Sequence, residues 1–153
     1  MRKKLLGTRH FGERVDVTDP CYDKDVWCRT TVTILPGEYT GYIWREWKTF
    51  RNGTRFAEPH CLGIYRGGII PPQKKRELIG TIGVDAGMFG FFENKPDYGE
   101  AEWQKICQRA LSKNPSWLHR DGFITLTADG DGAYPLYGYK DDAGNIVALE
   151  LYC

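Results

Sequence analysis

The chain has 153 residues, of which 41% are hydrophobic and 14% aromatic, and its 21 Lys and Arg residues nearly balance its 20 Asp and Glu residues. This composition is typical of a globular protein and excludes an intrinsically disordered chain. The length suits one β-rich domain over residues 1–153. Because the formal net charge is only +1, the composition gives no basic excess, and we expect no nucleic-acid partner.

The sequence also bears on the compartment in which the protein works. No apolar run approaches the roughly 20 residues that a membrane helix requires. After the basic residues at the start, only Leu5-Leu6-Gly7 follows, where a signal peptide needs about 7–15 apolar residues. Five cysteines, an odd number without an export signal, favour reduced thiols over a disulfide framework. We therefore expect a cytoplasmic protein with no membrane partner.

Strand signals begin early in the chain. Residues 30–34 alternate apolar and polar side chains, and Pro36-Gly37 supplies a turn. Residues 38–47 are rich in aromatic side chains, which favour a strand. Asn52-Gly53 predicts a hairpin turn into a second strand within residues 55–66, where Pro59 indicates an irregular or edge position.

The remaining strands are separated by clear loops. Residues 67–75 contain Gly-Gly, Pro-Pro and Lys-Lys pairs, which are typical of an exposed loop. In the last strand, Val147, Leu149 and Leu151 alternate as one buried face. Further strands are expected over residues 77–85, 88–92, 123–127, 133–139 and 145–152.

One helix is expected, and it completes the fold class. Asp97 can cap its start, with Glu100 three residues later as in a capping box, and Lys113-Asn114-Pro115 follows its end. An apolar stripe at helical spacing should lie against a sheet; it consists of Trp103, Ile106, Cys107 and Ala110. About eight or nine strands and one amphipathic helix packed on them predict a mainly β or α+β domain, with a largely antiparallel sheet or sandwich.

The stretch ADGDGAYP, residues 128–135, admits three interpretations. An EF-hand loop starting at Asp129 fails, because its twelfth position, normally glutamate, is Lys140. An anion nest is open, since glycines expose backbone N–H groups, although no Gly-Lys-Ser/Thr follows. The third interpretation is a tight bend in which Gly130 and Gly132 adopt positive φ.

Two other stretches place polar side chains at turns. Asp19 precedes Pro20 and suits a turn, and Asp85 follows a strand beside an aromatic run, as in many pockets. A nucleophilic Cys21 would need a histidine partner, and none of the three histidines has a spacing that singles it out. A zinc site is disfavoured because no Cys-x-x-Cys occurs.

Several motifs occur together in order along the chain: Asp-Pro-Cys-Tyr (19–22), Pro-Gly-Glu-Tyr (36–39), Gly-Val-Asp-Ala-Gly-x-x-Gly-Phe-Phe (83–92), Gly-Asp-Gly-x-Tyr-Pro-x-Tyr (130–137) and the closing segment 141–150. In these motifs the chain resembles a family of small bacterial and phage proteins of unknown function. The resemblance implies a compact β-rich domain. Relatives carried by phages would imply an accessory role in phage–host conflict, such as sequestering a small molecule or blocking a partner protein.

We expect a binding module rather than an enzyme, for a small polar ligand or a partner protein. Aspartates would orient the ligand and aromatic side chains would pack on it. The expected ligand-binding residues are Asp19, Tyr22, Trp27, Asp85, Asp129, Asp131 and Tyr134.

Two alternatives stay open. In the first, the chain is a divalent-metal-dependent hydrolase or lyase, which requires at least three carboxylates near one point; the candidates are Asp19, Asp85, Asp129 and Asp131. In the second, it is a protein–protein module that forms a homodimer through a sheet edge or an aromatic face. No other cofactor is expected.

Overall fold

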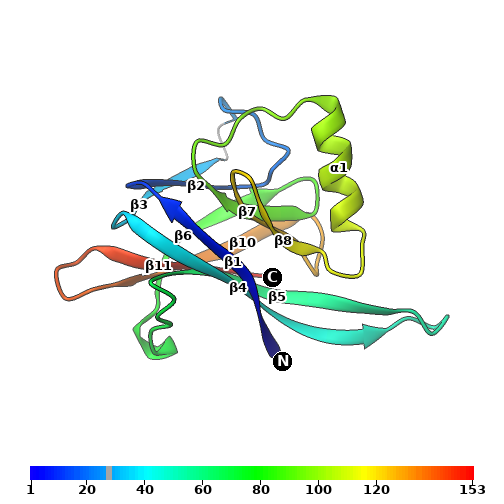
Figure 1. Cartoon of the computed structure of the whole chain (residues 1–153), viewed down its shortest axis with the longest axis horizontal. Coiled ribbons are helices and arrows are strands. Elements are labelled where there is room, and N and C mark those ends of the chain that lie inside the picture. Colours follow the sequence, from blue (N-terminus) through cyan, green and yellow to red (C-terminus); the bar gives the residue numbers. More distant parts are fainter. Residues whose placement is uncertain (27–28) are drawn as a thin grey trace.

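A computed structural model, which describes residues 1–26 and 29–153, shows a mainly β protein (Figure 1). The described residues form eleven strands, one α-helix and one short 3₁₀ helix. The strands form two antiparallel sheets, so the predicted fold class is confirmed. Trp27, which we expected to contact a ligand, lies outside the described residues. In the described part of the chain no helix is long and apolar enough to cross a membrane.

The larger sheet has six strands, and every neighbouring pair is antiparallel. In order across the sheet they are β1 (Arg2–Phe11), β4 (Gly37–Thr49), β5 (Arg55–Arg66), β11 (Ile146–Tyr152), β10 (Gly132–Lys140) and β6 (Glu77–Val84). The last strand of the chain, β11, thus lies at the centre of the sheet, and the first strand lies at its edge.

The smaller sheet has five strands and covers one face of the larger one (Figure 1). Its order is β3 (Thr30–Thr33), β2 (Arg14–Thr18), β7 (Met88–Phe92), β9 (Gly122–Leu126) and β8 (Ser116–His119). Side chains from both sheets form one apolar core, which includes Val17, Phe91 and Phe123 from the smaller sheet and Ile43 and Leu149 from the larger. We call the face of the larger sheet that points away from this core the outer face.

Helix α1 (Glu100–Ala110) packs on the far side of the smaller sheet. The predicted apolar stripe is confirmed, since Ile106 and Ala110 are buried against this sheet. The predicted cap is wrong: the helix N-cap is Gly99, and the Asp97 carboxylate instead accepts the backbone N–H of Lys24 at 2.7 Å. Asp97 therefore ties the start of the helix segment to the loop after β2.

The β4–β5 hairpin extends beyond the rest of the larger sheet (Figure 1, right). β1 pairs with β4 only as far as Arg45, and β11 pairs with β5 only over Cys61–Tyr65. Pro59 therefore lies where β5 has a single neighbour, next to a bulge in β5 at His60, which explains how a proline fits into this strand. We call residues 45–59 the arm.

Two glycines allow close contact between β7 and β9. A Cβ atom on Gly122 would lie 1.9 Å from the carbonyl oxygen of Phe91, and one on Gly90 would lie 2.2 Å from that of Phe123. We expect Gly122→Ala to lower the free energy of unfolding by about 3 kcal/mol, because rigid backbone must move apart.

The matched control is Gly80→Ala, since a Cβ atom there would meet no described atom within 4 Å. This variant should change the free energy of unfolding by less than about 1 kcal/mol. Urea denaturation of both variants measures the difference, and equal losses would contradict the close approach.

Candidate functional site

Asp19 is buried, and its carboxylate is fully used by backbone groups. It lies just after β2 and is 0% exposed. Its Oδ1 accepts the N–H of Cys21 at 2.8 Å, and its Oδ2 accepts the N–H groups of Asp85 at 2.8 Å and Ala86 at 2.7 Å. The side chain thus joins the end of β2 to the turn between β6 and β7, and its oxygens are directed at the backbone rather than toward solvent.

Three of the predicted residues do come together. The Tyr22 hydroxyl donates to Asp85 Oδ2 at 2.9 Å, and both side chains line an open hollow with Val26, Asp131 and Gly132. Asp131 is exposed at its edge. This hollow is the part of the predicted site that the structure assembles.

The other two described residues of the predicted site lie elsewhere. Tyr134 is buried in the core, where its ring meets Phe89 edge-on at 5.4 Å. Its hydroxyl donates to the carbonyl of Gly130 at 2.5 Å, and the Thr127 hydroxyl donates to the same carbonyl at 2.7 Å. Asp129 is exposed on this turn and is not among the residues that line the hollow.

The geometry of the turn itself favours one of the three interpretations. Gly130 and Gly132 have φ of 75° and 153°, so the segment 128–135 is a glycine-dependent bend that leads into β10, as the third interpretation predicts.

The metal hypothesis requires three aspartate oxygens near one point. Among the described residues, the groups of three or more donor atoms that lie within 4.8 Å of one another do not include Asp19, Asp85, Asp129 or Asp131. The predicted aspartate cluster is therefore not formed as a metal site in the described part of the chain.

A cluster of aromatic side chains covers the outer face of the larger sheet. Tyr65 and Tyr139 are 0% and 1% exposed, and Tyr42 and Trp44 pack against Tyr65 with ring centroids 6.1 and 5.8 Å away. A Cβ atom on Gly63 would lie 2.2 Å from the Tyr65 hydroxyl oxygen. Glycine at this position therefore leaves the space in which the Tyr65 ring lies along the sheet.

Glu150 lies at the centre of this cluster and is only 4% exposed. Its Oε1 accepts the hydroxyl groups of Tyr139 at 2.9 Å and Tyr152 at 3.1 Å, and its Oε2 accepts the hydroxyl of Tyr65 in a short hydrogen bond. Buried carboxylates are rare unless they are paired. Here three tyrosine hydroxyls donate to the carboxylate but bring no positive charge, and no basic side chain forms an ion pair with it in the described part of the chain.

This arrangement predicts a loss of stability in alkaline solution. Burial and the Glu150 charge raise the pKa of Tyr65, and burial raises that of Tyr139, whereas an unfolded tyrosine ionises near pH 10. Above that pH only the unfolded chain loses these protons, so the contribution of these tyrosines to the free energy of unfolding should stay level below pH 10 and fall above it. Urea denaturation at pH values from about 8 to about 11 measures this, and Tyr65→Phe should make the fall less steep.

A pocket of about 390 Å³ opens on the outer face beside Glu150. The connection between β5 and β6, which contains the short helix η1 (Gln73–Lys75), forms one side of it and lies opposite the smaller sheet (Figure 1). The volume is within the range of small-molecule sites. The walls combine apolar and aromatic side chains with a few polar groups: Met1, Trp44, His60, Cys61, Ile70, Pro71, Gln73, Tyr139, Glu150, Tyr152 and Cys153.

Sequence reasoning missed this pocket, although the signal was present. The alternation of Val147, Leu149 and Leu151 indicated one buried face, and Leu149 and Leu151 are indeed 0% exposed. Glu150 alternates with these residues, so its side chain lies on the other side of the strand, for which the pattern predicts no burial. Glu150 lies on the same side of the sheet as Tyr152 and as Gly63, its direct partner on β5. Aromatic side chains that share this side on neighbouring strands could have revealed a second buried face.

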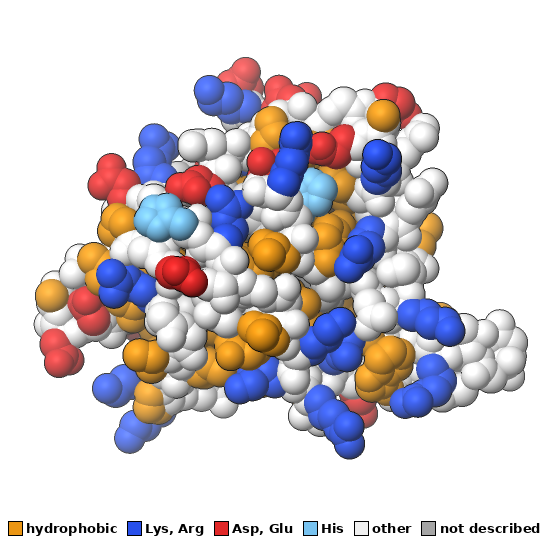
Figure 2. All heavy atoms as spheres, in the orientation of Figure 1, with side chains coloured by type: hydrophobic (Ala, Val, Ile, Leu, Met, Phe, Trp, Pro, Cys, Tyr) orange, Lys and Arg blue, Asp and Glu red, His pale blue; other side chains and the backbone are white. Residues whose placement is uncertain are grey.

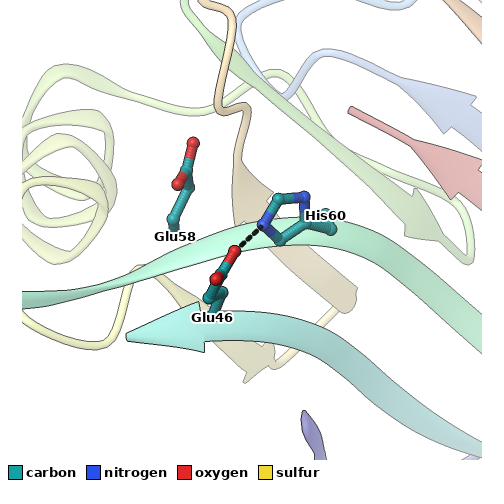
Figure 3. Close-up of side chains that lie close together, drawn as sticks. All are labelled: Glu46, Glu58 and His60. Atoms are coloured by element: carbon teal, nitrogen blue, oxygen red, sulfur yellow. Dashed lines mark ion pairs between the residues drawn. The ribbon is translucent and has the colours of Figure 1, made fainter. Parts of the chain in front are cut away.

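Two clusters of described residues could hold a metal ion. Glu46, Glu58 and His60 lie at the base of the arm and each offers a donor atom within 4.8 Å of the others. Figure 3 shows Glu46 and His60 facing each other from β4 and β5, with 3.6 Å between Glu46 Oε2 and His60 Nε2. Lys48 Nζ lies 2.8 Å from Glu58 Oε2 and competes with a metal for that oxygen. His60 also lines the pocket, so this acidic group lies at its rim.

The second cluster, Glu102, His119 and Asp121, joins α1 to the β8–β9 turn. Arg120 contacts both carboxylates, at 2.7 Å from Glu102 and 3.2 Å from Asp121. This cation already neutralises the acids that would bind a metal.

The described cysteines are free thiols, as predicted. Burial and the Asp19 carboxylate raise the pKa of Cys21, and burial raises the pKa of Cys153 to about 12. These groups are therefore protonated near neutral pH and are poor nucleophiles.

Comparisons with protein-family models, with curated proteins and with solved structures find no match to this chain. The family resemblance drawn from the motifs therefore stays a prediction.

Proposed function

We propose that the chain is a binding protein for a small, positively charged organic molecule, held in the outer-face pocket. One observation carries the proposal: Glu150 is a buried carboxylate that lines an aromatic-walled pocket and has only tyrosine hydroxyls as described hydrogen-bond partners. A cation would complete the neutralisation of this charge. The expectation of a binding module for a small polar ligand is thus kept, with a different set of residues.

The hydrogen-bonding pattern of the pocket favours a donor. The hydroxyl proton of Tyr139 is directed at Glu150. Toward the pocket Tyr139 therefore offers oxygen lone pairs, which accept hydrogen bonds. The Tyr152 hydroxyl already has Arg76 as a hydrogen-bond partner. An ammonium or guanidinium group supplies several N–H donors and no acceptor, so it complements such a surface better than an anion does.

Aromatic rings and nearby charges support the same ligand class. Trp44 lines the pocket, and an indole face attracts cations. Glu46 lies by His60, which lines the pocket, and adds negative charge there, whereas the charge of Glu58 is paired with Lys48. The hollow beside Tyr22 is less favoured, because its tyrosine hydroxyl and the Asp85 carboxylate already bond to each other.

Binding is favoured over catalysis by the state of the nucleophiles in the pocket. Burial raises the pKa of Cys61 well above its usual value, so the thiolate is scarce at neutral pH. The cytoplasmic location, the homodimer and the role in phage–host conflict remain predictions from the sequence.

Isothermal titration calorimetry with matched probes tests the proposal. Phenethylammonium carries a positive charge, and 2-phenylethanol has a similar shape without the charge. The account predicts that the ammonium binds and that the alcohol binds at least about tenfold more weakly. Equal affinity for the two probes, or tighter binding of phenylacetate, would contradict the proposed ligand class.

A further inference from the structure

The arm separates its charges by face. Side chains alternate along a strand, so Arg45 and Trp47 of β4 lie on one face, and Arg55, paired with Thr49, lies on the same face. Glu46 and its cross-strand partner Glu58 lie on the opposite face. Glu46 and Glu58 thus lie on the outer face, where the pocket opens, and Arg45 and Arg55 lie on the face of the sheet toward α1.

The basic side continues from the arm onto the neighbouring strand and the helix. Arg2 of β1 is directly opposite Arg45 in the sheet, and Lys4 has the same parity as Arg2. Burial lowers the pKa of Lys4, and the charges of Arg45 and Arg109 lower it further. These cations are therefore close enough to repel one another. We call Arg2, Lys4, Arg45, Arg55 and Arg109 the basic face.

The cations of the basic face have no acidic partners. No carboxylate of the described residues forms an ion pair with any of the five, whereas Lys48 on the other side of the arm is paired with Glu58 at 2.8 Å. Like charges opposite each other in a sheet are destabilising. A bound polyanion would relieve this repulsion.

An exposed aromatic ring lies among these charges. The guanidinium groups of Arg45 and Arg55 lie 5.0 and 5.2 Å from the Trp47 ring centroid, and Trp47 is 36% exposed. The stacked rings of Phe50 and Phe56 lie on the other face of the arm, because Phe56 is paired with Lys48. Figure 2 shows basic side chains along the side of the molecule that carries α1, β1 and the arm, with a hydrophobic side chain between basic ones on the arm.

We propose that the basic face and the arm bind single-stranded nucleic acid. Arginine and lysine would contact successive phosphates, and the exposed Trp47 ring and the guanidinium planes would stack on unpaired bases. The formal net charge of +1 argued against such a partner, but that sum does not show that five cations without acidic partners gather on one face. This inference is independent of the proposed function, because the pocket lies on the opposite face.

Fluorescence anisotropy with a labelled mixed-sequence DNA strand of about 15 nucleotides tests the proposal. Five phosphate contacts at roughly 0.7 per contact predict a slope of about −3.5 for log affinity against log salt, between about 50 and 200 mM. The double variant R55Q/R109Q should weaken binding at least about tenfold and reduce the slope by roughly 1.4. The control K3Q/K74Q removes the same charge outside the basic face and should change affinity by less than about twofold.

Two further probes separate stacking from charge. An abasic strand of the same length keeps the phosphates and loses the bases, and we expect it to bind at least about tenfold more weakly. Trp47→Ala should cause a loss of similar size with the intact strand and little with the abasic one. Equal binding of intact strand, abasic strand and phosphatidylserine vesicles would show a general polyanion site and overturn the assignment. Equal losses in the two double variants, or no binding at about 50 mM salt, would overturn it as well.

Discussion

Asp19→Ala is expected to lower the free energy of unfolding by about 5 kcal/mol, the largest effect of any single side chain considered for this protein. The carboxylate accepts three backbone N–H groups, from Cys21, Asp85 and Ala86, at 2.7 to 2.8 Å. Hydrogen bonds to a charged group contribute roughly 1.5–3 kcal/mol each. Without the carboxylate, the loop after β2 and the β6–β7 turn lose the group that joins them.

Urea denaturation of Asp19→Ala, Asp19→Asn and Asp129→Ala measures this role. Asparagine keeps one acceptor oxygen but places an NH₂ group against backbone donors, so we expect it to retain only part of the stability. Asp129 is exposed, and its removal should change stability by less than about 0.5 kcal/mol. If Asp19→Ala cost no more than Asp129→Ala, the connecting role of Asp19 would be wrong.

Glu150→Ala should lower the free energy of unfolding by about 4 kcal/mol. Tyr65 and Tyr139 are 0% and 1% exposed, and both hydroxyls donate to Glu150. Removing the acceptor leaves these buried donors unpaired, at roughly 1–3 kcal/mol each. A small cavity next to the rings adds to the loss.

A comparison of three proteins separates the hydrogen bonds from the packing. When Tyr65→Phe and Tyr139→Phe are combined with Glu150→Leu, the acceptor and its two fully buried donors are removed together, and only the half-buried Tyr152 hydroxyl loses its partner. This triple variant should therefore recover much of the stability that Glu150→Ala loses. Urea denaturation supplies the free energies of the native protein, Glu150→Ala and the triple variant. A triple variant that is less stable than Glu150→Ala would show that the hydrogen bonds do not account for the loss.

The alternation of side chains predicted most of the sheet, but not all of its strands. Residues 30–34 and 145–152 showed clear patterns, and both are strands. β1, β2 and β8 were missed: the exposed positions of β1, the five-residue length of β2 and the four-residue length of β8 leave little periodic signal. Asp97 was expected to cap the helix, but tertiary contact with Lys24 uses its carboxylate instead.

The candidate site was harder to predict because burial depends on both sides of a sheet. Asp85, Tyr22 and Asp131 were chosen from local motifs, and they do lie together. Glu150 carries no motif, and its burial arises from tyrosines that lie 11 and 85 residues away in sequence. Only the strand order, which places β11 between β5 and β10, brings these side chains together.

The most direct test of the proposed function is a calorimetric titration of phenethylammonium into the native protein, Glu150→Gln and Asp131→Asn. Both variants remove one carboxylate, the first from the outer-face pocket and the second from the hollow beside Tyr22. The account predicts that Glu150→Gln weakens binding at least about tenfold and that Asp131→Asn changes it by less than about twofold. The reverse pattern would move the site to the hollow and contradict the assignment to Glu150.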